Sequence, residues 1–252
     1  MSNVDGTPGY PGRMAQRDAA AHPPGHHHQD VSGGWLRAAV FGAMDGLVTN
    51  IGLVAGVGGG GAGREAIILT GMAGLVAGAF SMALGEFASV GTQNDAVARE
   101  VAVERDEIRR HPRAEQTELA DTYQAMGLTR PTAEAMAREV HQNPDLAVRV
   151  HVVQELGVDP DEQPSTWTAA FSSFACFAVG AILPLVPFLL GSGSLALGLS
   201  VGAVGLVLLG ALTSRFTTRP WWWAGLRQLA FGVIAAGATY AVGWLIGVNV
   251  GG

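Results

Sequence analysis

Two carboxylates and a thioether lie inside stretches of sequence that are otherwise apolar. Asp45 interrupts VFGAMDGLVTNIGLVAGV, and Glu86 interrupts a second apolar run in which Met82 comes four residues earlier. An acid at the centre of a bilayer helix costs roughly 2.5–3.5 kcal/mol, so such residues usually face a pathway or a partner. On a helix, Met82 and Glu86 share one face. Carboxylates with a thioether suit a transition metal of intermediate softness better than Mg²⁺ or Ca²⁺, which prefer oxygen alone.

Each of these residues also has a simpler interpretation. Met82 could face lipid or fill a packing gap. Glu86 could lie close enough to the membrane surface for water to hydrate its charge. Asp45, which has no Arg or Lys in the middle of a span to neutralise it, could be protonated and hydrogen-bonded to a neighbouring helix.

A second set of candidate ligands lies further along the chain, outside the apolar runs. Glu100, Glu104 and Glu107 fall at i, i+4 and i+7, which is one face of a helix. Two later segments each carry a pair at i, i+3, namely Glu115 with Glu118 and Met136 with Glu139. Three helices that project such pairs could surround divalent cations with oxygen ligands and one sulfur. The alternative is a set of solvated helix faces in which Glu pairs with Arg.

The composition indicates an integral membrane protein. Of 252 residues, 48% are hydrophobic and only 14% are charged, whereas a soluble domain carries about a quarter charged residues. Spanning a bilayer takes roughly 20 mainly apolar residues. Five stretches meet this requirement: 35–58, 66–91, 167–190, 195–215 and 224–248. The sequence therefore predicts an all-α membrane protein with five transmembrane helices.

The remaining residues form two further regions. Residues 1–34, broken by Pro and Gly and containing the cluster His26-His27-His28, are predicted to be a disordered tail. That cluster could attract metal, or it could be low-complexity sequence without a role. Residues 93–164 separate spans one and two (35–92) from spans three to five (165–252), and hold fifteen acids against eight arginines.

The 93–164 segment is predicted to be a helical module. Nothing between Gly91 and Pro112 breaks a helix, so span two should continue as a stalk to about Arg110. Three or four short helices should follow. The apolar positions of the segment recur at helical spacing, as in Leu146, Val150, Val153 and Leu156.

Arginine positions predict the topology, since the chain has no lysine. They cluster before span one, after span two and between spans four and five. By the positive-inside rule the N-terminus and residues 92–166 are cytosolic, and the C-terminus is on the opposite side. GxxxG-like glycine pairs, such as Gly42 with Gly46, suit close helix contacts, including a dimer seam.

Three motifs together resemble the vacuolar iron transporter family. They are FGAMDGLVTNIGLVAGV, AGAFSMALGEFASVGTQND and the EVAVERDEI that follows, and the likeness extends over residues 35–250. The resemblance implies a homodimer of five-span protomers with a cation pathway at the dimer interface. It also implies a cytosolic three-helix metal-binding module between spans two and three.

The resemblance assigns roles residue by residue. Asp45 and Met82 match the pair that coordinates ferrous iron in the membrane, and Gly85-Glu86 matches the GE pair of span two. In the module, the E-x-x-E pairs and the Met-x-x-Glu are matched by six residues: Glu104, Glu107, Glu115, Glu118, Met136 and Glu139. Glu100 is a further metal candidate.

The chain departs from the family pattern at two places. Ala135 stands where members can carry a second methionine, so one soft ligand is missing. An apolar, Gly-rich stretch around Gly74 stands where members can carry an acid early in span two. The first departure leaves the metal affinity of the module open. The second leaves open whether span two has a binding site for protons or metal at this position.

We therefore expect a proton-coupled transporter that exports Fe²⁺, and also Mn²⁺, from the cytosol, with Zn²⁺ and Co²⁺ as further candidates. We expect no enzymatic activity, no cofactor, no nucleic-acid partner and a bacterial plasma membrane as the location. If span one lines the dimer seam, two copies of Asp45 would meet and release protons as metal enters. Two alternatives remain: a membrane-tethered sensor or buffer that binds Fe²⁺ without moving it, and a passive leak of Mn²⁺ or Zn²⁺.

Overall fold

The computed structural model describes residues 34–250 of the chain, with side chains over residues 35–247. The predicted disordered tail and the His26-His28 cluster lie outside the described residues. The described part contains helices and no strand. Its α-helices are α1 (Gly34–Gly59), α2 (Arg64–Arg110), α3 (Pro112–Ala125), α4 (Arg130–Val140), α5 (Pro144–Leu156), α6 (Thr166–Ile182), α7 (Val186–Leu189), α8 (Leu195–Thr213) and α9 (Trp221–Val250).

Five of the helical segments are long and apolar enough to cross a membrane, which confirms the five predicted spans. They cover Trp35–Gly59, Arg64–Arg110, Thr166–Leu189, Leu195–Phe216 and Trp221–Gly247. The third is not a single α-helix, because a 3₁₀ turn at Leu183–Leu185 separates α6 from α7. Pro184 and Pro187 lack the backbone N–H that a continuous α-helix would need there.

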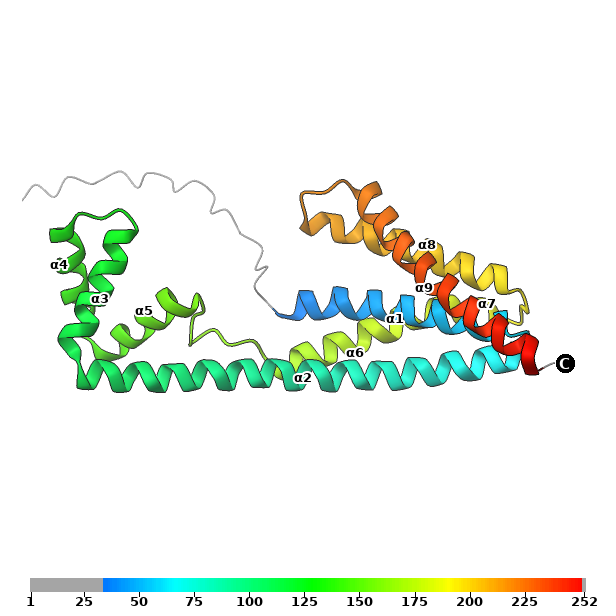
Figure 1. The fold of residues 1–252 in the computed structure, drawn as a ribbon, viewed down its shortest axis with the longest axis horizontal. Helices are drawn as coiled ribbons and strands as arrows, with labels where there is room; N and C mark the ends of the chain where they lie inside the picture. The colour runs from blue at the N-terminus through cyan, green and yellow to red at the C-terminus, as the bar shows by residue number, and fades with distance from the viewer. Residues whose placement is uncertain (1–33, 251–252) are drawn as a thin grey trace, which may run out of the picture. The chain divides into compact units, whose positions relative to one another are not determined.

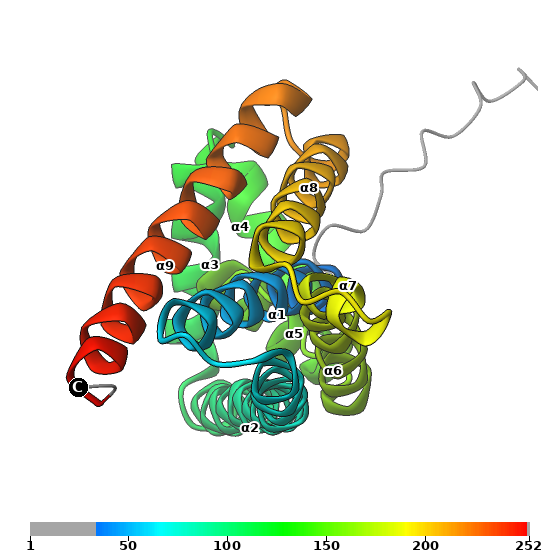
Figure 2. The ribbon, with the colours of Figure 1, turned by 90° about the vertical axis from the view of Figure 1, so that its right-hand side faces the viewer.

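Helix α1 is the central helix of the transmembrane group. It contacts α2, α6, α8 and α9, and Figure 2 shows it surrounded by these four. Glycine permits the closest approaches. A Cβ added at Gly46 would lie 2.2 Å from the carbonyl oxygen of Phe177, and one at Gly180 would lie 2.2 Å from that of Ala43. Gly42 and Gly46 therefore pack against α6 within one protomer.

A buried amide also ties α1 to its neighbours. Nδ2 of Asn50 donates hydrogen bonds to the carbonyl oxygens of Gly71 on α2 (3.1 Å) and Ala181 on α6 (2.6 Å). Helix carbonyls normally accept from their own helix, so these bonds add specific cross-links in an otherwise apolar interior. They fix the register of α1 against both helices.

Helix α2 continues well beyond the apolar run, as the sequence predicts. It has 47 residues and ends at Arg110, just before Pro112 begins α3. Its first half lies along α1 and α6, and its C-terminal part contacts α3 and α5 (Figure 1). One helix therefore carries Met82 and Glu86 in its apolar half and Glu104 in its polar half.

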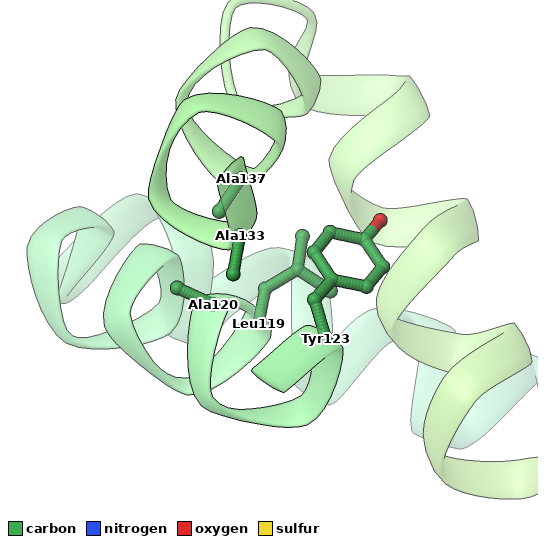
Figure 3. Close-up of a cluster of buried hydrophobic side chains, with 5 residues drawn as sticks. All are labelled: Leu119, Ala120, Tyr123, Ala133 and Ala137. Atoms are coloured by element: carbon green, nitrogen blue, oxygen red, sulfur yellow. The ribbon is translucent and has the colours of Figure 1, made fainter. Parts of the chain in front are cut away.

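The short helices α3, α4 and α5 pack around two separate apolar clusters. Figure 3 shows the first, in which Leu119, Ala120 and Tyr123 of α3 meet Ala133 and Ala137 of α4. The second joins α2 to α5 through a different set of side chains: Ile108, Ala147, Val148 and Val152. Helix α5 is therefore the helix whose side chains face α2, while α4 packs on α3.

Candidate metal centre

Three side chains from three helices converge in the module. Glu104 of α2, Glu115 of α3 and His151 of α5 each offer one ligand atom, and these atoms all lie within 4.8 Å of one another. Nδ1 of His151 is 3.1 Å from Oε1 of Glu104 and 3.9 Å from Oε2 of Glu115. The positions follow from packing, because the apolar contacts of Val148 and Val152 hold α5 against Ile108 of α2.

The group is shielded from solvent and lacks a full set of internal partners. Glu104 and His151 are 8% and 2% exposed. Oε1 of Glu104 makes no hydrogen bond within the described residues, although the His151 ring lies beside it. A buried polar atom without a hydrogen bond costs roughly 1–3 kcal/mol, and more when it is charged. A divalent cation would satisfy this oxygen, and a set of two carboxylates with an imidazole suits Fe²⁺, Mn²⁺ or Zn²⁺.

The pKa values of these three residues favour metal binding near neutral pH. Burial, followed by repulsion from Glu155, Glu115, Glu118 and Glu107, raises the pKa of Glu104 to about 7. Burial also raises the pKa of Glu115 and lowers that of His151. A neutral imidazole is the form that binds metal. At neutral pH, a metal ion would therefore meet a ready nitrogen ligand and displace a proton from Glu104.

The second ring nitrogen of His151 has its own partner. Its Nε2 lies 3.1 Å from Nε2 of His141 at the end of α4, and the two rings meet edge to face. Burial lowers the pKa of His141, and His151 lowers it further. When His151 donates its Nε2–H to His141, its Nδ1 lone pair faces the carboxylates. Metal-binding histidines are commonly oriented in this way.

The structure brings together some of the predicted module ligands. Glu104 and Glu115 belong to the group. Glu107 and Glu118 lie near enough to raise the pKa of Glu104 but are not among the three ligands. Glu100 is exposed and raises the pKa of Glu155.

The Met-x-x-Glu pair of α4 is placed differently. Met136 is 41% exposed, Glu139 is also exposed, and the converging group does not include either residue. The reason is that α4 turns Ala133 and Ala137 toward α3. The third helix that contributes to the group is therefore α5.

The sequence analysis missed His151 and its neighbour Glu155. Oε1 of Glu155 lies 3.7 Å from Nδ1 of His151, one helical turn away. Leu146, Val150, Val153 and Leu156 do lie on helix α5, as their spacing predicts, but Leu146 and Leu156 are 43% and 42% exposed. The buried face is instead Ala147, Val148, His151 and Val152. A His with an acid four residues later, in HVVQE, was the available signal.

Asp45 and Met82 lie in the transmembrane group. Asp45 is half-buried on α1 and accepts a hydrogen bond from Oγ1 of Thr49 at 3.4 Å. Within the described residues no ion pair neutralises it. Met82 is partly buried and packs against the apolar cluster of Ala79, Phe177 and Ala181.

Glu86 has a partner that the sequence analysis did not anticipate. Oε2 of Glu86 lies 2.9 Å from Nη2 of Arg37, near the start of α1. The Glu86 side chain is only 9% exposed, whereas that of Arg37 is 60% exposed. The carboxylate is thus buried and paired, and a cation could reach it only in competition with the guanidinium.

The Gly74 region also has a structural explanation. A Cβ added at Gly74 would lie 2.3 Å from Cδ1 of Leu53 and 3.1 Å from Oδ1 of Asn50. Leu53 of α1 therefore fills the space that a side chain on α2 would need. An acid at this position would require the Leu53 side chain to move out of this space.

Comparisons with known proteins identify relatives of this chain. The sequence model of the VIT family matches residues 36–244. The chain is 33% identical to the vacuolar iron transporter of Acanthamoeba castellanii, over 88% of this chain and 83% of that protein. It is 32% identical to vacuolar iron transporter homolog 1 of Oryza sativa subsp. japonica, over 85% and 75%. Vacuolar iron transporter 1 of the same rice is 27% identical, over 89% and 92%. Together with the five membrane-crossing helices, these matches show that the chain belongs to the VIT family.

Proposed function

We propose that this chain is a membrane transporter that moves Fe²⁺ out of the cytosol, with Mn²⁺ as a second substrate. The names of its relatives support iron as the substrate. The observation that carries the proposal is that α2 holds two sets of candidate ligands. Met82 and Glu86 lie in its membrane-crossing half, and Glu104 lies in the half that contacts α3 and α5.

The acidic group of the module is the proposed point of capture. Glu104, Glu115 and His151 offer two oxygens and one nitrogen, a mixed set that suits Fe²⁺, Mn²⁺, Co²⁺ and Zn²⁺. The surplus of acids in residues 93–164 would attract cations toward this group. In the proposed topology these residues face the cytosol, in a plasma membrane with the C-terminus outside.

The proposed route through the membrane passes Glu86 and Met82 and reaches Asp45. Glu86 would receive the ion by exchanging its Arg37 partner for metal. Asp45 is the next proposed ligand of the ion. It has no ion-pair partner among the described residues, and Thr49 is its hydrogen-bond donor. Ionisable side chains within transmembrane segments commonly mark an ion or proton pathway.

Proton coupling follows from the same residue if the protein is a homodimer with α1 at the seam. Two Asp45 carboxyl groups facing each other cannot both ionise readily, so at least one would hold a proton when no metal is bound. Entry of a divalent cation would expel that proton. The energy for export would then come from a proton gradient.

A second candidate function is a membrane-tethered metal sensor or buffer. The observation that favours it is that the three-ligand group lies entirely on α2, α3 and α5, without a residue from the other spans. Such a protein would bind Fe²⁺ but would have no use for Asp45 or Met82.

Accumulation of metal distinguishes the two functions. Purified protein is reconstituted into sealed liposomes, and Fe²⁺ entry is followed with a trapped fluorescent chelator under a pH gradient that is acidic inside. A transporter accumulates Fe²⁺ beyond protein-free liposomes and stops when the gradient is collapsed. Binding of Fe²⁺ to the protein without accumulation would support the sensor. Entry that ignores the pH gradient would indicate a passive leak.

A further inference from the structure

The module contains a second polar feature, a cavity of about 730 Å³. It lies where the C-terminal ends of α2 and α4 meet the first turns of α3 and α5. Four arginines line it: Arg105, Arg109, Arg113 and Arg138. Gln116, Gln142 and His141 add hydrogen-bonding groups, and Pro112, Ile108 and Val148 form apolar parts of the wall.

This concentration of positive charge runs against the composition of the module. Residues 93–164 hold fifteen acids and eight arginines, so half of the arginines line one cavity. Asp145 is the one acid in the lining of this cavity. It pairs only loosely with Arg105, at 3.5 Å and with both side chains exposed.

Two of the four arginines form no ion pair among the described residues. Arg109 pairs with Asp106, but neither Arg113 nor Arg138 forms an ion pair with any described residue. Several arginines of the module outside the cavity do form ion pairs. Arg130 pairs with Asp121 and Glu134, and Arg149 pairs with Asp159 and Asp161. Arg99 also forms no ion pair with a described residue, but it lies outside the cavity; Arg113 and Arg138 differ from it in sharing one lining with two further arginines.

Like charges that share a cavity repel one another, and an anion would relieve this repulsion. Guanidinium groups present a planar fork of N–H donors that matches phosphate oxygens in a bidentate manner. The volume falls within the range of about 300–1,000 Å³ typical of small-molecule sites, which exceeds what a single inorganic ion needs. The apolar wall could accommodate an organic part of the ligand.

We propose that this cavity binds a small, multiply charged anion that carries phosphate groups. Arg113 of α3 and Arg138 of α4 supply its main charges, and Arg105 and Arg109 of α2 supply the others. A membrane lipid is the wrong source for this ligand. Arg105 lies fourteen residues beyond Gly91, which at 1.5 Å per residue is about 21 Å past the end of the apolar run.

The test uses full-length protein in detergent, freed of metal with a chelator that is then removed. Binding of tripolyphosphate, ATP and adenosine is measured by calorimetry at low ionic strength. The expected result is saturable binding of tripolyphosphate or ATP and no binding of adenosine. Absence of saturable binding for both phosphate probes, or equal binding of adenosine and ATP, would overturn the proposal.

Variants locate the site. Arg113→Gln with Arg138→Gln should weaken binding at least tenfold, while Arg99→Gln with Arg219→Gln should leave it unchanged. The control pair removes the same charge from two arginines that have no ion pair within the described residues and lie outside the cavity lining. Gln116→Glu with Gln142→Glu, which keeps every arginine, should also weaken binding. Unchanged affinity in both cavity variants would refute the assignment.

Discussion

Arg37 of α1 holds the buried carboxylate of Glu86 on α2 at 2.9 Å. The pair joins the first two membrane helices at the end of α1 where the chain enters the bundle. It also gives Glu86 a positive partner without any metal. If Glu86 lies on the metal route, as proposed, Arg37 competes with the incoming cation for the same oxygens.

This competition predicts opposite effects at the two residues. Arg37→Gln should lower the KM for Fe²⁺ about two- to fivefold, since a partly exposed ion pair contributes about 1 kcal/mol or less. Glu86→Gln should reduce flux strongly. Initial rates of Fe²⁺ entry into proteoliposomes at several concentrations measure both. A KM that Arg37→Gln leaves unchanged, together with full flux in Glu86→Gln, would remove Glu86 from the route.

The module offers a direct comparison between α5 and α4. His151→Ala should lower the affinity for Co²⁺ or Fe²⁺ about tenfold or more, because it removes a nitrogen ligand from the group. Glu139→Gln on α4 is the matched control, since Glu139 is exposed and outside the group. Calorimetry on the full-length protein measures both. The reverse ranking would favour the Met136–Glu139 pair as ligands.

The pKa of Glu104 predicts how pH affects metal binding. Burial raises this pKa from 4.5 to about 7. Below about pH 7 a proton therefore competes with the metal, and affinity should fall as the pH drops from 8 to 6. In Glu104→Gln the affinity should be lower at every pH, and its dependence on pH should be weaker. Measuring proton release on binding in two buffers checks this, and a pH-independent affinity in the parent protein would contradict it.

The same shift predicts an effect on stability. Folded protein keeps a proton on Glu104 up to about pH 7, whereas the unfolded chain loses it near pH 4.5. The contribution of Glu104 to the free energy of unfolding is therefore complete below about pH 4.5, and it is lost as the pH rises through 7. His141 and His151, with lowered pKa values, act in the opposite direction. Comparing the parent with Glu104→Gln cancels their contribution.

In that comparison, metal-free Glu104→Gln should be more stable than the parent at pH 8, by about 1–3 kcal/mol, since one pKa unit corresponds to about 1.4 kcal/mol. The two proteins should be nearly equal at pH 4.5. Thermal unfolding at the two pH values, or hydrogen exchange of α2 and α5, gives the measurement. A variant less stable than the parent at pH 8 would mean that Glu104 is not strained by its neighbours.

Packing between α1 and α6 predicts a stability difference between two glycines. Gly46→Ala places a Cβ 2.2 Å from the carbonyl oxygen of Phe177, which backbone movement must relieve. The expected cost is about 1–3 kcal/mol. Gly237→Ala on α9 is the control, because nothing lies within 4 Å of its added Cβ. Equal unfolding temperatures for the two variants would contradict the close approach of α1 to α6.

Much of the fold was predictable because it depends on local signals. Apolar runs of sufficient length mark the five spans, and the absence of Pro and Gly after Gly91 carries α2 to Arg110. The 3₁₀ turn in the third span could have been anticipated from Pro184 and Pro187. Acids at helical spacing likewise pointed to Glu104 and Glu115.

The remaining ligands depend on which helix packs on which, and this is not a local property. Helix α4 packs on α3 through Ala133 and Ala137, and this packing leaves Met136 outside the group of Glu104, Glu115 and His151. His151 was missed because it sits between Val148 and Val152 on an apolar face, where a histidine resembles a core residue. The Arg37–Glu86 pair joins residues 49 positions apart, and no local pattern in the sequence indicates that these two residues meet.

The central claim is that Asp45 carries Fe²⁺ across the membrane in exchange for protons. The most direct measurement records Fe²⁺ entry and lumenal pH together in proteoliposomes containing the parent protein or Asp45→Asn, which keeps the size of the side chain and removes its charge. The parent protein should accumulate Fe²⁺ while protons leave, and Asp45→Asn should lose both fluxes while its module still binds metal. Parent-like Fe²⁺ entry in Asp45→Asn, or entry without proton movement, would contradict the claim.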